Sequence, residues 1–163
     1  MFKKIRFSCA SMVLVLMLGM AGYAVSADYA AMEGVDSANA VFDFRIGEAQ
    51  KALGHLKLIH TMVNDPGMVI NGEQPEIVIV LIGPSVKLVT TEKAKSNQAQ
   101  QGALAEQISK MDKDGITFEI CMAAAHAFDV SADVILPEIQ QVPNGWISVI
   151  GYQQRGYALI ADF

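Results

Sequence analysis

The chain has 163 residues, 52% of them hydrophobic, and a net charge of −5, which fits one domain with a substantial core. An acidic chain repels phosphate backbones and anionic membrane surfaces, so nucleic acid and lipid bilayers are poor candidates as partners.

The N-terminus has the order of a cleavable secretory signal peptide. Three basic residues among the first six precede an apolar run over about residues 10–24, and small residues follow up to Ala27. The run is shorter than the roughly 20 residues that span a bilayer, so we expect cleavage after Ala27, with Ala24 as the nearby alternative. Removing residues 1–27 takes away three of the 12 Lys and Arg residues and leaves 136 residues with a net charge of −8. We therefore expect a periplasmic or secreted protein that is free of the membrane after cleavage.

The first half of the remaining chain alternates between strand and helix patterns. Residues 28–39 are small and polar without periodicity and predict a loose leader before a single domain over residues 40–163. Residues 41–45 predict a first strand. Apolar residues at helical spacing predict a helix over residues 48–64, which Asp65, Pro66 and Gly67 end. The continuous β-branched run 77–82 is typical of a central parallel strand that is covered on both faces.

The polar residues 91–102 predict a solvated loop or the exposed start of a helix. That helix continues through an apolar stripe (Leu104, Ile108 and Met111), and Gly115 stands where a helix usually ends. A third strand over residues 116–121 and a short helix over residues 122–128 follow.

The last part of the chain predicts a fourth strand over residues 139–142, a helix that Asn144 caps, and a final strand over residues 157–161. In that helix we expect Trp146, Val149 and Ile150 to face inward. Alternating strands and helices predict an α/β fold, a compact doubly wound and mainly parallel sheet of about five strands with helices on both faces.

Cys121 is the only cysteine expected in the mature protein, because Cys9 lies within the signal peptide. A single cysteine is a buried hydrophobe, an intermolecular link or a reactive thiol. Cys121 ends its strand where backbone N–H groups of the next helix are free, and these groups favour a thiolate, a persulfide or an oxyanion. Alternation places Cys121 with Thr117 and Glu119 on the more polar face of the strand, although the charge of Glu119 disfavours a thiolate.

Other candidate residues give weaker indications of a functional site than Cys121 does. His126 is five helical steps from Cys121, about 140° around a helix, so we expect no thiol-imidazole pair. His55 and His60 have the wrong spacing for a shared metal, and we expect them to be partly exposed. No motif for a metal, nucleotide or dinucleotide is present, so we predict no metal and no cofactor. Lys87 attracts an anion or is an ordinary solvated lysine.

The order of four segments resembles that of the DsrE/DsrF-like sulfur-relay family. They read VFDFRIGEAQKALGHLKLIHTMV, PEIVIVLIGPSVKLV, GITFEICMAAAHAFDV and ILPEIQQVPNGWISVIGYQQRGYALI, over roughly residues 41–160. The resemblance implies a doubly wound α/β domain that assembles into trimers or hexamers. It also implies that Cys121 matches the cysteine that accepts sulfane sulfur as a persulfide and passes it to a partner thiol.

The leading hypothesis is therefore an exported, sulfurtransferase-like sulfur carrier. Its partners are a sulfane sulfur donor and an acceptor protein thiol, and the persulfide forms on Cys121. The alternatives are a non-catalytic oligomeric binding or assembly module and a redox-sensing thiol protein.

Overall fold

The computed structural model describes residues 29–94 and 99–162, and the predicted signal peptide lies outside them. Within these residues the chain forms five strands: β1 (Ala40–Phe44), β2 (Ile77–Leu81), β3 (Thr117–Cys121), β4 (Ile139–Val142) and β5 (Ala158–Asp162). The same residues form five α-helices that connect or flank the strands: α1 (Ala49–Val63), α2 (Thr91–Ala94), α3 (Ala99–Lys113), α4 (Met122–Ala127) and α5 (Gly145–Gln154). Within the described residues, no helix is long and apolar enough to cross a membrane.

The strands form one parallel sheet in the order β4-β3-β2-β1-β5. All five residues of β1 and of β2 are buried, as expected of strands that are covered on both faces, and Asp43 of β1 is the one charged residue among them. The predicted α/β architecture is confirmed. β5 pairs only with β1 and is therefore an edge strand, and four of its five residues are exposed.

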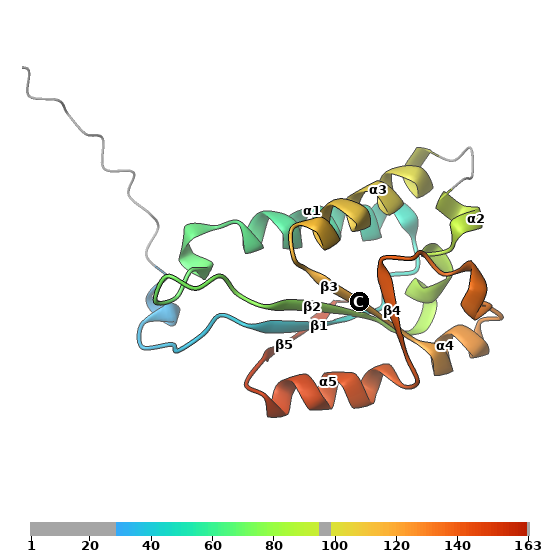
Figure 1. Ribbon diagram of the computed structural model, residues 1–163. Coiled ribbons are helices and arrows are strands. Elements are labelled where there is room, and N and C mark those ends of the chain that lie inside the picture. Colours follow the sequence, from blue (N-terminus) through green and yellow to red (C-terminus); the bar gives the residue numbers. More distant parts are fainter. Residues whose placement is uncertain (1–28, 95–98, 163) are drawn as a thin grey trace, which may run out of the picture.

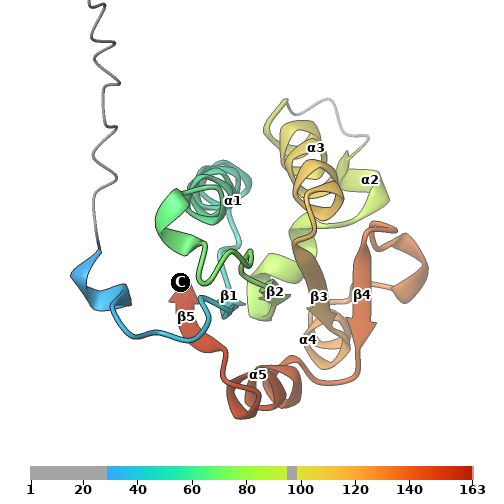
Figure 2. The ribbon, with the colours of Figure 1, turned by 60° about the vertical axis from the view of Figure 1, so that its left-hand side comes forward.

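Figures 1 and 2 show α1 and α3 together on one face of the sheet and α5 on the other. The larger core lies beneath α1 and α3 and includes Leu56, Ile108 and Phe118. A smaller core lies beneath α5 and contains Val41, Val78, Val80, Ile82, Cys121, Val149 and Tyr157. Neighbouring residues of one strand thus enter different cores, as strand geometry requires.

The polar stretch that was predicted as a loop or helix start contains α2 and the first turn of α3. α3 ends at Lys113, and Gly115 follows with a φ of 90°, which suits a glycine beyond a helix C-terminus. In the predicted leader, a 3-10 turn covers Ala30–Met32, and the hydroxyl of Tyr29 donates to Asp65 Oδ2 at 3.0 Å.

The predicted orientation of α5 is wrong in part. Asn144 caps the helix as expected, because its side chain accepts from the Trp146 N–H at 3.0 Å. Val149 is buried, but Trp146 and Ile150 are each 58% exposed. Most residues at the start of α5 are apolar, so the sequence does not mark one face, and the helix instead packs through Gly145 and Val149.

Candidate functional site

Cys121 is the last residue of β3 and the N-cap of α4. Its Sγ accepts a hydrogen bond from the backbone N–H of Ala124 at 3.4 Å. This is the position that the sequence predicted, at the carboxyl edge of the sheet where a strand passes into a helix. The sulfur thereby accepts from one of the backbone N–H groups that the start of a helix leaves without an intrahelical partner.

The thiol is buried: Cys121 is only 4% exposed. The alternation of β3 is as predicted, because Phe118 and Ile120 enter the larger core and Cys121 enters the smaller one. The face that Cys121 shares with Glu119 is covered, because Gly145 and Val149 of α5 pack against it. Local alternation indicates which face a residue occupies, but not what packs against that face.

The chain that enters α5 forms the cover over Cys121. Val142 is the register partner of Cys121 in β4, and the carbonyl of Pro143 accepts from the Ala123 N–H at 3.1 Å. Gly145 follows, and a Cβ at this position would lie 2.9 Å from the Cys121 Cβ and 2.9 Å from Ile82 Cγ1. Glycine therefore allows the backbone to approach the cysteine closely.

Glu119 lies two residues before Cys121 on the same face of β3 and is 6% exposed. Its Oε1 accepts from the Tyr152 hydroxyl at 2.7 Å, while its Oε2 has no hydrogen-bond partner within the described part of the chain. Burial, followed by this hydrogen bond, raises the pKa of the Tyr152 hydroxyl above its ordinary value. The Arg155 guanidinium lies 4.4 Å from the centroid of the Tyr152 ring. A buried carboxylate thus stands beside the buried thiol and is anchored to α5.

The pairing of Glu119 with Tyr152 was not predicted from the sequence. An acidic residue inside an otherwise apolar buried strand is a signal that a partner is required. The sequence does not identify the partner, because Tyr152 is 33 positions away on another element.

Within the described residues, no hydrogen bond links any of the three histidines to the Cys121 thiol. His126 is exposed on α4, whereas Cys121 is buried. His55 Nδ1 lies 2.6 Å from Asp162 Oδ1, at the carboxyl end of β5. The prediction for His60 is wrong, since it is 8% exposed and its Nε2 lies 2.8 Å from Asp114 Oδ2.

His60 also lies next to Gln107 of α3, whose amide nitrogen is 3.2 Å from His60 Nδ1. Because both ring nitrogens are occupied, His60 joins α1 to α3. Across residues 29–94 and 99–162, no group of three His, Cys, Asp or Glu side chains is placed to hold a metal ion.

Lys87 lines a cleft of about 780 Å³ at the same edge of the sheet, and its ammonium lies 5.1 Å from the centroid of the Phe128 ring. Cys121 does not line this cleft. The thiol and the cleft are therefore two separate features of the carboxyl edge.

The parallel sheet, the helices on both faces and the cysteine at a strand end define a doubly wound α/β protein with one strand-end thiol. Comparison with family models identifies the group more closely: the model of the DsrE/DsrF-like family matches residues 12–161. The chain belongs to this family, which is generally associated with sulfur relay.

A solved structure shares the fold. The protein of unknown function MTH1491 from Methanobacterium thermoautotrophicum is 18% identical, with a TM-score of 0.60 over 77% of this chain and 99% of that one. No curated protein matches the chain.

Proposed function

We propose that the protein is an exported sulfur carrier that holds sulfane sulfur as a persulfide on Cys121. The observation that carries the proposal is the backbone N–H of Ala124 directed at the Cys121 sulfur. The association of the DsrE/DsrF-like family with sulfur relay supports the same chemistry.

The proposed reaction needs one nucleophile and no external oxidant. The Cys121 thiol releases its proton to water, and the thiolate attacks the outer sulfur of thiosulfate or of a polysulfide. A new sulfur-sulfur bond forms while the old one breaks, and sulfite or a shortened polysulfide leaves with the electron pair. An acceptor thiolate then attacks the outer sulfur of the persulfide, and the Cys121 thiolate leaves unchanged.

The burial of Cys121 sets conditions on this reaction. The 4% exposure leaves no room for a protein thiol to reach the sulfur in the described conformation. Transfer therefore requires Pro143 and Gly145 to move away from Cys121. Small inorganic donors need the smallest opening, so we expect thiosulfate or polysulfide to load the protein faster than a protein persulfide does.

The test is intact-mass spectrometry of the purified mature protein after incubation with thiosulfate or polysulfide. We expect a gain of about 32 Da, one sulfur atom, which a reducing thiol reverses. A Cys121→Ala variant is the matched control and should gain nothing. Absence of the gain in the native protein, or the same gain in the variant, contradicts the proposal.

The proposal includes export to the periplasm or to the medium. Expression of the full chain followed by cell fractionation and N-terminal sequencing tests it. We expect the mature chain to begin at Asp28. A full-length chain that stays in the cytoplasm contradicts export without affecting the sulfur chemistry.

A non-catalytic oligomeric binding or assembly module is the second candidate function. The burial of Cys121 favours it, and so does an exposed apolar surface on α5 and β5. We call this the α5/β5 surface; its residues, with their exposed fractions, are Trp146 (58%), Ile147 (68%), Ile150 (58%) and Leu159 (45%). An apolar edge strand beside an apolar helix face is typical of surfaces that another chain covers.

We therefore propose that copies of the chain associate through the α5/β5 surface, as trimers or hexamers. Sedimentation velocity tests this with Ile147→Lys, which should lower the mass to that of one chain. Leu58→Lys is the matched control, because Leu58 is 69% exposed on α1. Equal effects of the two substitutions, or none, contradict the assignment.

Two measurements distinguish the candidate functions: the gain of mass from polysulfide and the alkylation of Cys121. A module without sulfur chemistry gains no mass from polysulfide and resists alkylation at Cys121. A redox-sensing thiol, the third alternative, forms a Cys121-dependent dimer on non-reducing electrophoresis.

A further inference from the structure

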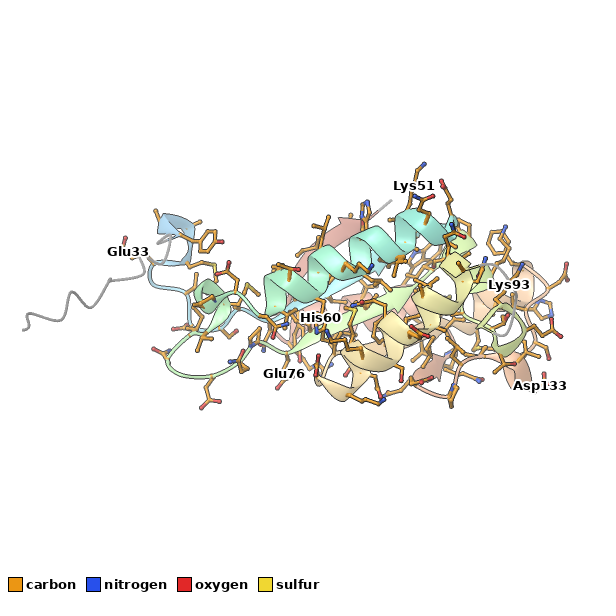
Figure 3. All side chains as sticks on the ribbon, turned by 90° about the horizontal axis from the view of Figure 1, so that it is seen from above. Glu33, Lys51, His60, Glu76, Lys93 and Asp133 are labelled. Atoms are coloured by element: carbon orange, nitrogen blue, oxygen red, sulfur yellow. The ribbon has the colours of Figure 1, made fainter. Side chains whose placement is uncertain are left out.

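The cleft that Lys87 lines has no part in the proposed sulfur chemistry. Its walls come from the chain that enters α1, the 3-10 segment after β2, α2, the start of α3, and residues 129–134. Figure 3 labels Lys51, Lys93 and Asp133 at this end of the molecule, opposite Glu33. The volume of about 780 Å³ falls within the range of small-molecule sites, which is about 300–1,000 Å³.

The charges around the cleft are balanced. Glu48 lines it but pairs with Lys51 at 3.1 Å. The other charged lining residues are two cations, Lys87 and Lys93, and two anions, Glu92 and Asp129. A ligand with charge of one sign is attracted by half of these groups and repelled by the other half. A ligand that carries both signs at separate places can be attracted by all of them.

Backbone N–H groups in the lining favour the negatively charged part of such a ligand. Glu48 is the N-cap residue of α1, but its side chain makes no capping hydrogen bond. The first intrahelical bond runs from the Ala52 N–H to the Glu48 carbonyl, so the backbone N–H groups of Ala49 and Gln50 make no bond within the helix. These N–H groups and the dipole of the 15-residue helix favour a carboxylate.

Gln101 provides an independent observation. It lines the cleft and is 8% exposed, and its side-chain oxygen has no hydrogen-bond partner within the described residues. A buried acceptor without a donor is costly. Because Gln101 lines the cleft, a donor that enters the cleft is a group available to this oxygen. An ammonium or a peptide N–H supplies the missing donor.

We propose that this cleft binds a peptide-like zwitterion, of about dipeptide to tripeptide size. Its carboxylate lies at the start of α1 near Lys93, and its ammonium or amide N–H groups lie toward Asp129 and Gln101. The volume exceeds what a single amino acid fills, which favours the larger members of this class. The assignment does not depend on Cys121.

Isothermal titration calorimetry tests the proposal in the Cys121→Ala protein, so that thiol chemistry cannot contribute. The probes are alanylalanine and trialanine, with succinate and cadaverine as comparators of one charge sign. We expect at least one zwitterion to bind with a Kd below about 1 mM and about tenfold more tightly than either comparator. No binding of either zwitterion, or equal binding of the comparators, overturns the proposal.

Matched variants locate the site. Asp129→Asn removes the charge and suits the positive φ of 56° at this position, and Lys93→Ala removes the opposite charge. Each should weaken binding about tenfold. Lys57→Ala changes an exposed lysine of α1 that does not line the cleft and should leave the Kd unchanged. Unchanged affinity in both cleft variants places the ligand elsewhere and refutes the assignment.

Discussion

Gly145 determines how closely α5 covers the thiol, and Gly145→Ala tests this role directly. An alanine Cβ there would lie 2.9 Å from the Cys121 Cβ and 2.9 and 3.0 Å from two side-chain carbons of Ile82. Non-bonded carbons normally lie about 3.5–4.0 Å apart, so the start of α5 must move outward by about half an ångström or more. Overpacking of this kind costs about 1–3 kcal/mol.

If the same outward movement of α5 exposes Cys121, the free energy needed to uncover the thiol falls by the same amount, about 1–3 kcal/mol. The rate of native-state alkylation then rises about 5-fold to about 150-fold, because each 1.4 kcal/mol is a factor of ten. The assay combines urea unfolding with the rate of iodoacetamide labelling, followed by mass. Gly151→Ala is the matched control, because a Cβ at Gly151 in the same helix meets nothing within 4 Å. It should be at least as stable as the native protein and label no faster. If Gly145→Ala has the stability and labelling rate of the native protein, the close approach of Gly145 does not control access.

The tyrosines near α5 give two further predictions. Tyr152→Phe should lower the free energy of unfolding by about 1–3 kcal/mol, because it leaves the buried Glu119 carboxylate without its donor. Tyr157→Phe should lower the free energy of unfolding by less, because its partner Glu76 is exposed to water. Urea unfolding compares the two variants, and equal losses of stability would contradict this expectation. Burial, with the hydrogen bond to Glu76, raises the pKa of Tyr157 to about 12 from 10.0. The folded state therefore keeps this proton more firmly than the unfolded chain, so its stabilising contribution is complete below pH 10 and is lost as the pH rises toward 12. Urea unfolding between pH 9 and about 11.5 should show a smaller decline for Tyr157→Phe than for the native protein.

The sequence predicted the strands well because each is a short segment with its own ending signal, and the central strand β2 is a continuous apolar run. β2 is buried along its whole length, as six consecutive apolar residues indicate. The alternation of β3 correctly separated Cys121 from Phe118. These properties depend on the local chain, since a strand directs neighbouring side chains to opposite faces wherever it lies.

The errors concern contacts between distant segments. His60 is buried because Asp114, 54 residues later, and Gln107 meet its ring. Cys121 is buried because the chain entering α5 folds back over it. The cleft also has this origin, because its walls come from several separate segments. Periodicity carries no information about which segments meet, so the sequence left the burial of the thiol as one of three alternatives and did not indicate the cleft.

The two candidate functions meet at α5, because the inner side of this helix covers Cys121 and its outer side carries exposed Ile147. If assembly covers the outer side, it also holds α5 against the sheet, so opening of the thiol requires dissociation or local strain. Mass action then predicts that alkylation of Cys121 slows as the protein concentration rises from about 1 to about 100 μM. Ile147→Lys should label at one rate over this range, whereas Leu58→Lys should keep the dependence of the native protein. A native rate that is independent of concentration, in a protein that sedimentation shows to be assembled, would mean that assembly does not restrain α5.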